Sequence, residues 1–458
     1  MSSPPSQENC SAESNYEADL DIESGSELHD LASKARKLAS QGSFLLATRL
    51  YARVLRRHSP NIDSGIWREF NVLLGARKLG SRREQLIWKS TEGFLDRRFE
   101  RIKTAVLKGD AVRASSDFRT YASGIYCDHC LPKLVAAIEA ISLGGSPKSE
   151  QLQQILDRYR EGPAVVIVAG MNWSGSSAVF DFLREFDDAV AVETEIPHLS
   201  RGQFNLAQVW KVQNDADQLR TASIEFLFRY LFGFSKVREA MDFRIYKFAR
   251  RKLFSSRACD YSQSVIECAV IVSAICSQSV TANADVLIRA LANIVLTKLV
   301  TSESVGDSKV LVLNNAVKAV NLSQDLPLTH STAFSVFRDP RDCYVAEVQE
   351  KHNLGIPVDP WIRSARRRYE IATSIIGEAE QHGSRKRVIK IQFEEFVTSE
   401  TERFRVRNLA GLESSSRSEQ FTFFDAEKSQ SNIDIFRNYD DEYGVSRIEK
   451  LMPNYLWE

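Results

Sequence analysis

The segment of this chain best suited to bind an anion is a run of small and polar residues at 170–177. The apolar run before it predicts a buried strand, and the apolar stripe after it predicts a helix. A loop between a strand and a helix presents unpaired backbone N–H groups and the positive end of a helix dipole. Gly175 lets the backbone approach an anion. Hydroxyl donors lie beside it, at Ser174, Ser176 and Ser177.

This segment is not a Walker loop, because the pattern G-x-x-x-x-G-K-[ST] needs a Lys that the segment lacks. Without that Lys, Mg-nucleotide hydrolysis loses its usual electrophile. The structural alternative is a plain strand-to-helix turn capped by serine.

A pair of arginines follows another predicted strand, at residues 333–337. Asp339 can cap a helix, and Pro340 suits the first helical position. Arg338 and Arg341 are therefore expected at the carboxyl end of a strand, where open α/β sheets bind ligands. Their guanidinium groups suit a phosphate dianion. The alternative is a helix start stabilised by salt bridges.

Together these two elements resemble the sulfotransferases that use 3′-phosphoadenosine 5′-phosphosulfate (PAPS). In that family the strand–loop–helix unit binds the 5′-phosphosulfate, and an Arg-Asp-Pro-Arg-Asp-like motif binds the 3′-phosphate. The resemblance implies that PAPS is the co-substrate. It implies contacts to PAPS from Ser174, Gly175, Ser176, Ser177, Ala178, Arg338 and Arg341.

Two later segments extend the resemblance to residues 162–458. Residues 387–398 look like the family's strand that ends in a Tyr-Glu-Asp-Leu-like turn. Residues 429–437 look like its late Ser-x-x-Asn-Ile loop, which closes over the nucleotide. This loop adds Asn432 and Arg437 to the implied nucleotide contacts.

The chain departs from the family at two positions. Trp173 stands where the family usually places Lys or Arg, and Ala346 stands where it places a Ser that contacts the 3′-phosphate. Loss of the cation would remove several kcal/mol of transition-state stabilisation. Lys318, just after a predicted strand end, is a candidate replacement.

Sulfuryl transfer also needs a base for the proton of the acceptor hydroxyl. Residues 192–199 resemble the Glu-x-His-Phe-Phe segment of heparan-type sulfotransferases, whose Glu is the base. The resemblance implies Glu195 as the base, with Glu193 and His198 as the next candidates. The alternative for Glu195 is a solvated carboxylate at a strand end.

The resulting hypothesis is a PAPS-dependent sulfotransferase that acts on a hydroxyl of a glycan or glycoconjugate. One alternative is a non-catalytic nucleotide-binding or scaffold protein with a degenerate sulfotransferase domain. The other is an atypical P-loop kinase. No metal site is expected, because Cys127 and Cys130 have the spacing of half a zinc site and no second pair follows within finger distance.

The elements that must position these residues form an α/β pattern. Apolar runs that predict strands alternate with helical patterns, which is typical of a parallel sheet in a P-loop-like sulfotransferase domain over residues 149–458. Residues 215–305 are expected to form a helical insertion. The predicted strands are Ala164–Ala169, Ala189–Val192, Val310–Leu313, Ala333–Phe337 and Val388–Ile391.

Residues 30–148 predict an all-α helical-repeat domain, whose first unit resembles a tetratricopeptide repeat and would present a protein partner. An ordinary helical bundle is the alternative. The Gly- and Ser-containing segment 144–149 predicts the linker to the next domain. Residues 1–29 are acidic and Ser-rich, which predicts a disordered tail.

Bulk composition fits a soluble protein of more than one domain, because 458 residues exceed one ordinary core. Sixty Lys and Arg residues balance sixty Asp and Glu residues. This balance of charge argues against nucleic acid as a partner. The most apolar stretch, near 268–276, is expected to be too short to span a bilayer. The scattered cysteines and the lack of a signal-like N-terminus predict a cytoplasmic location.

Overall fold

The computed structural model places the chain in two compact units, residues 1–94 and residues 95–458. The expected boundary between residues 148 and 149 thus lies inside the second unit. The structure describes residues 25–43, 46–47, 50–51, 54, 100–122, 126, 129–145, 147–192, 196, 198–200, 202–232, 258–277, 283–301, 309–350, 356–382, 386–417 and 423–458.

The described part of the first unit is a helix followed by a turn into a second helical segment. Helix α1 (Gly25–Ser40) overlaps the predicted tail by its first five residues, 25–29, and residues 1–24 lie outside the described residues. Gly42 adopts a left-handed φ of 83°, which ends the helix because glycine tolerates this conformation. Ala35 and Tyr51 are buried on either side of this turn.

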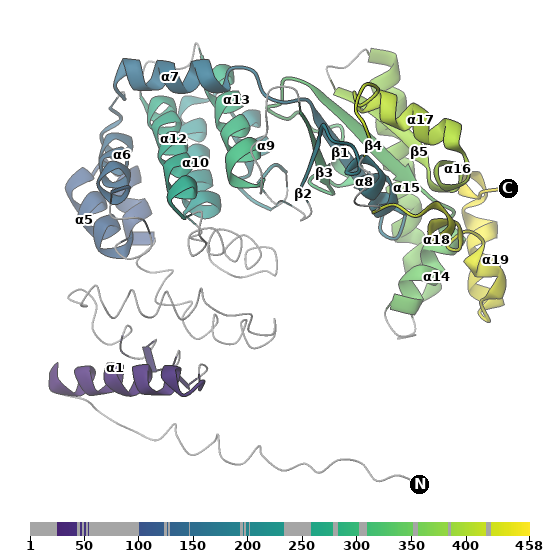
Figure 1. Cartoon of the computed structure of the whole chain (residues 1–458), viewed down its shortest axis with the longest axis horizontal. Helices are drawn as coiled ribbons and strands as arrows, with labels where there is room; N and C mark the ends of the chain where they lie inside the picture. The colour runs from purple at the N-terminus through teal and green to yellow at the C-terminus, as the bar shows by residue number, and fades with distance from the viewer. Residues whose placement is uncertain are drawn as a thin grey trace, which may run out of the picture. The chain divides into compact units, whose positions relative to one another are not determined.

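The second unit contains a sheet of five parallel strands in the order β2-β3-β1-β4-β5 (Figure 1). Each strand overlaps one of the five predicted runs, so the α/β class with a parallel sheet is confirmed. Ile167 at the centre of β1 pairs with Leu313 of β3 and Ala333 of β4. The strands are β1 (Val165–Gly170), β2 (Ala189–Val192), β3 (Val310–Asn314), β4 (Ser331–Phe337) and β5 (Lys386–Gln392).

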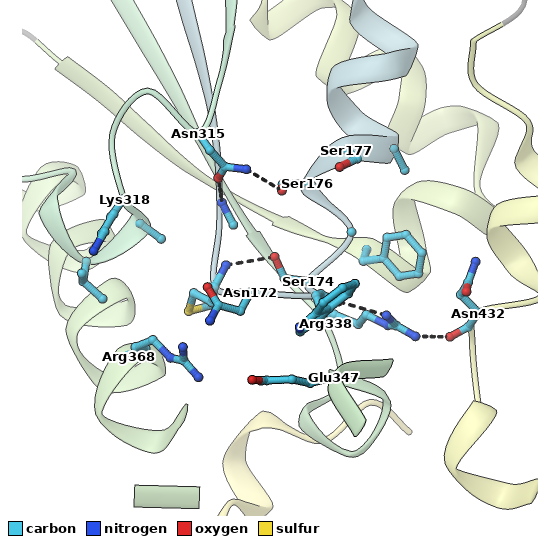
Figure 2. A pocket seen from close by; sticks show the side chains of 18 of the residues that line it. Asn172, Ser174, Ser176, Ser177, Asn315, Lys318, Arg338, Glu347, Arg368 and Asn432 are labelled. Carbon is cyan, nitrogen blue, oxygen red and sulfur yellow. Dashed lines mark hydrogen bonds between the residues drawn. The ribbon is translucent and has the colours of Figure 1, made fainter. Parts of the chain in front are cut away.

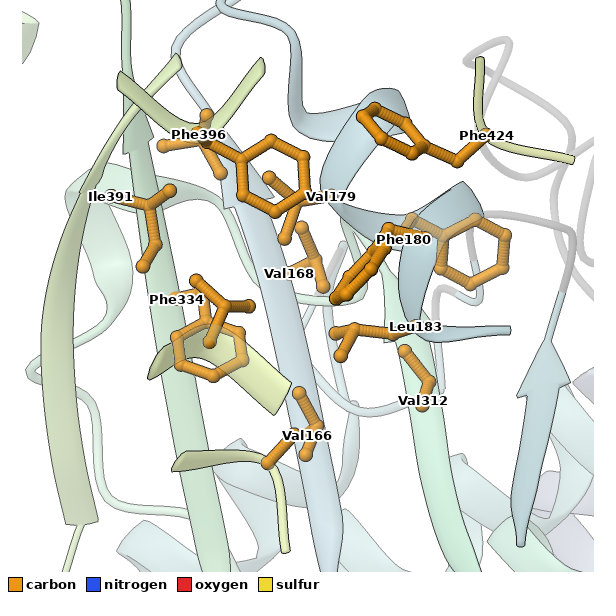
Figure 3. Close-up of a cluster of buried hydrophobic side chains, with 14 of the residues drawn as sticks. Val166, Val168, Val179, Phe180, Leu183, Val312, Phe334, Ile391, Phe396 and Phe424 are labelled. Atoms are coloured by element: carbon orange, nitrogen blue, oxygen red, sulfur yellow. The ribbon is translucent and has the colours of Figure 1, made fainter. Parts of the chain in front are cut away.

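Both faces of the sheet are covered by helices, as expected for a parallel sheet. Helix α8 (Ser176–Leu183) packs on one face, where Phe334 of β4 belongs to the buried core shown in Figure 3. Side chains alternate along a strand, so Phe337 points to the other face. There its ring lies 5.5 Å from that of Tyr369 in α15 (Val358–His382).

The remaining elements near the sheet lie between β3 and the C-terminal end of the chain. They are η4 (Ala319–Asn321), α14 (Pro340–Glu350), α16 (Phe393–Thr398), α17 (Glu400–Leu409), α18 (Ala426–Gln430), η5 (Ile435–Asn438), α19 (Glu442–Leu451) and η6 (Pro453–Tyr455).

The elements inserted between β2 and β3 are helical, as predicted for residues 215–305. They pack with helices that precede β1, and α12 contacts α6, so the predicted linker lies within one compact unit. The helices are α5 (Ala111–Ala122), α6 (Leu131–Leu143), α7 (Ser149–Tyr159), α9 (Leu206–Lys211), α10 (Ala216–Phe226), η2 (Leu227–Leu231), α12 (Ala258–Cys276), α13 (Ala284–Ile294) and η3 (Val295–Leu299).

The apolar stretch in helix α12 is longer than expected from the sequence. Among the described residues, Cys259–Cys276 is an 18-residue stretch long and apolar enough to cross a membrane, although 83% of it is buried inside the protein. Within this helix Glu267 is buried, and it accepts hydrogen bonds from Tyr159 Oη at 2.9 Å and Arg158 Nη1 at 2.8 Å. These bonds connect α7, which precedes β1, to helix α12.

Candidate functional site

A pocket of about 930 Å³ lies at the carboxyl ends of β1, β3, β4 and β5 (Figure 2). This is the edge of an open α/β sheet at which ligands bind. The loop after β1 forms its floor. Its walls come from residues after β3, from Arg338 after β4, from Phe393 after β5 and from Asn432 in the late segment.

The loop after β1 has the geometry of an anion cradle. Asn172, Trp173 and Gly175 have left-handed φ values of 60°, 54° and 80°, a conformation that occurs in backbone turns whose N–H groups bind anions. In the described part of the chain, the N–H groups of residues 172–177 donate to no acceptor. Helix α8 starts directly after them, which adds the positive end of its dipole.

Glycine is required at position 175 for two reasons. Its φ of 80° is left-handed, and a Cβ atom there would lie 2.1 Å from the Phe393 ring. We expect Gly175→Ala to lower the free energy of unfolding by about 1–2 kcal/mol from backbone strain alone, with the clash in addition. Urea denaturation measures the change.

The matched control is Gly377→Ala in α15, where nothing lies within 4 Å of the added Cβ. It should stabilise the protein by about 0.5–1 kcal/mol, because helical glycine costs conformational entropy. Equal effects of the two substitutions would contradict the requirement for glycine at position 175.

Asn315 fixes the loop to the end of β3. Its Oδ1 accepts from Gly170 N–H at 3.0 Å, and its Nδ2 donates to Ser176 Oγ at 3.4 Å. Ser174 Oγ accepts from Met171 N–H at 3.0 Å, so this hydroxyl also shapes the loop. Lys318 follows in the same turn, is exposed, and lines the pocket. The sequence-based candidate for the missing cation is therefore beside the loop.

Arg338 is the buried cation of the pocket, with only 4% of its surface exposed. Its Nη1 donates to the Trp173 carbonyl oxygen at 2.9 Å, and its Nη2 donates to the Asn432 carbonyl oxygen. Its Nε is buried and donates to no acceptor among the described residues. A buried donor left unpaired costs free energy, so an anionic ligand at this position would be stabilised.

Asp342 ties the late segment to this wall. Its carboxylate accepts from Asp434 N–H at 3.0 Å and Phe436 N–H at 3.2 Å. Burial raises the pKa of Asp342 to about 6, although nearby Arg338 opposes the shift. The late loop predicted at 429–437 thus reaches the pocket, where Ser429 and Asn432 line it.

Two predicted nucleotide contacts do not line the pocket. Arg341 pairs with Asp339 at 2.7 Å and with Glu449 at 2.9 Å, which directs it toward the C-terminal helix α19. Arg437 pairs with Asp434 at 3.1 Å and has 67% of its side chain exposed. Arg341 therefore has a structural role, because its partners fasten the end of the chain to the start of α14. The other predicted contacts all line the pocket: Ser174, Gly175, Ser176, Ser177, Ala178, Arg338 and Asn432.

The three predicted catalytic residues follow β2. Glu193 and Glu195 lie outside the described residues. His198 is fully buried against Tyr230, with ring centroids 5.3 Å apart, and it does not line the pocket. Burial lowers the pKa of His198 to about 4. This histidine is therefore neutral at pH 7 and belongs to the core.

The low pKa of His198 predicts acid sensitivity. Because the folded pKa of about 4 lies below the unfolded value of 6.5, the unfolded state binds more protons between these values, and stability falls as pH falls through this window. Between about pH 7 and pH 5 the loss is about 2 kcal/mol. The difference in unfolding free energy between the wild type and His198→Asn should shrink by that amount. A constant difference would contradict this prediction.

Among the charged residues that line the pocket, two were not predicted from the sequence, Arg368 in α15 and Glu347 in α14. Glu347 Oε2 accepts from Trp361 Nε1 at 2.9 Å. Arg368 directly precedes Tyr369, which is buried together with Ala365 and Ala372. This helical spacing places Arg368 at the border of the buried stripe. It is the sequence feature from which the position of Arg368 could have been predicted.

A metal site finds no support in the described ranges, where no group of three or more His, Cys, Asp or Glu side chains could hold an ion. Cys130 is buried at the start of α6, and Cys127 lies outside the described residues. No protein-family model, curated protein or solved structure matches this chain, so its function is inferred from the geometry of the site.

Proposed function

We propose that the chain is a PAPS-dependent sulfotransferase whose acceptor is a hydroxyl of a glycan or glycoconjugate. The observation that carries the proposal is that the loop after β1 and Arg338 after β4 line one pocket. Their backbone N–H groups and the guanidinium Nε, which have no partner in the described part of the chain, suit a ligand with two separate anionic groups. The glycan class rests on the resemblance of residues 192–199 alone.

In the proposed reaction the acceptor oxygen attacks the sulfur of PAPS. A new O–S bond forms while the S–O bond to the 5′-phosphate breaks, and the electron pair of the broken bond stays on the phosphate oxygen. The acceptor proton passes to a carboxylate base, and 3′-phosphoadenosine 5′-phosphate (PAP) leaves. The protein contributes position and positive charge.

Calorimetric titration of the full chain tests this proposal. PAP should bind at micromolar affinity and raise the melting temperature, because a ligand of the folded state stabilises it by mass action. ATP and AMP should bind more weakly, since they lack the 3′-phosphate. Equal affinities and equal rises in melting temperature for all three nucleotides would refute the specificity for PAPS.

A second candidate is a non-catalytic nucleotide-binding protein. Trp173 favours it, because its side chain lines the pocket with 40% of its surface exposed and carries no charge. This candidate predicts binding of PAP without transfer of labelled sulfate to any acceptor. A kinase would instead require preferential binding of Mg-ATP.

A further inference from the structure

The pocket contains a second set of cations, apart from Arg338. Lys318 and Arg368 both line it, and neither forms an ion pair with any residue in the described part of the chain. Arg368 Nε is buried and has no hydrogen-bond partner there. Figure 2 shows these two residues on one side of the loop, with Asn432 on the other side.

The fold fixes where these two cations lie. Lys318 comes three residues after Asn315, whose side chain is hydrogen-bonded to both ends of the loop. Helix α15 packs on η4, which begins directly after Lys318. The hydroxyl of Tyr369, the neighbour of Arg368, donates to the Arg338 carbonyl oxygen. These contacts hold the loop and the chain segments that carry Lys318 and Arg368.

The charge of the pocket indicates what this side binds. The loop carries no cation of its own, since Trp173 occupies the position next to Ser174. Two cations that have no anionic partner in the described part of the chain attract an anion into the pocket that they line. A ligand held by Arg338 at one phosphate would still have a second phosphate to neutralise.

We propose that Lys318 and Arg368 form a subsite for the 5′-phosphate of the nucleotide, whereas Arg338 serves the 3′-phosphate. This inference rests on the proposed function. In the transfer described above, the 5′-phosphate oxygen keeps the electron pair of the broken S–O bond and gains negative charge. Lys318 and Arg368 stabilise that charge from outside the loop and so compensate for Trp173.

Binding of three nucleotides separates the two subsites. Arg368→Ala and Lys318→Ala should each weaken PAP and 5′-AMP by about 10–150-fold, the range for a hydrogen bond to a charged group. Both should leave the affinity for 3′-AMP within about twofold, because 3′-AMP has no 5′-phosphate. Arg338→Ala should show the reverse pattern, with a loss for 3′-AMP and not for 5′-AMP. Calorimetric competition measures all the affinities.

The matched control is Arg367→Ala, which removes the same charge from an exposed position of α15 that does not line the pocket. Its affinities should equal those of the wild type. If Arg368→Ala folds poorly, Lys318→Ala still tests the subsite, because Lys318 lies in an exposed turn and its substitution should not disturb folding. Equal losses for 3′-AMP and 5′-AMP, or no loss for either, would overturn the subsite.

Failure of this inference differs from failure of the proposed function. If the wild type binds PAP no better than 5′-AMP, the proposed function is wrong, yet a loss of 5′-AMP binding in Arg368→Ala would still support a 5′-phosphate subsite. If the wild type prefers PAP and Lys318→Ala and Arg368→Ala bind it normally, the subsite is wrong and the proposed function stands.

Discussion

Replacement of Arg338 by alanine should weaken binding of PAP by about 1.5–3 kcal/mol, the usual contribution of a hydrogen bond to a charged group. The residue is 4% exposed, and its Nε has no partner among the described residues, so the ligand would supply the missing acceptor. Isothermal titration of the wild type and Arg338→Ala with PAP measures the difference.

Arg341→Ala is the matched control for this experiment. It removes the other arginine of the motif, whose partners are Asp339, Glu449 and the Trp457 carbonyl oxygen. We expect a lower melting temperature with little change in the affinity for PAP. If Arg338→Ala binds PAP normally and unfolds easily, the motif is only a helix start stabilised by salt bridges.

The sheet could be predicted from the sequence because its information is local. Each strand is a short apolar run between helical patterns, and a strand such as β1 is buried along nearly its whole length. Parallel strands deliver their carboxyl ends to one edge. Polar residues directly after such runs, such as Ser174 and Arg338, were therefore predicted to meet, and both line the pocket.

Other parts of the site depend on contacts distant in sequence. The direction of Arg341 is set by Glu449, which lies 108 residues later, and no local pattern reveals that pair. Arg368 and Glu347 reach the pocket from the middle of helices, where no motif marks them. Residues 95–148 belong to the second unit through contacts with the helical insertion, such as that of Lys103 Nζ with Glu225 Oε1 of α10 at 2.6 Å.

The largest expected effect concerns the proton of the acceptor hydroxyl. Glu195→Gln should lower the turnover of radiolabelled sulfate by about 10²–10⁴-fold, the usual contribution of a general base. The affinity for PAP should stay nearly unchanged, because the glutamine has the same shape and the base contacts the acceptor rather than the nucleotide. Turnover and titration on the same preparations separate the two quantities.

Glu347→Gln is the matched control, since it neutralises a carboxylate that lines the pocket. One oxygen of Glu347 already accepts the Trp361 indole N–H, and the residue lies on α14, in the helix that begins with the nucleotide motif. We therefore expect Glu347→Gln to retain transfer. Loss of transfer in Glu347→Gln together with an active Glu195→Gln would assign the base to Glu347. Binding of PAP by a wild type that transfers sulfate to no glycan acceptor would favour the non-catalytic candidate, in which Trp173 has replaced the loop cation without compensation.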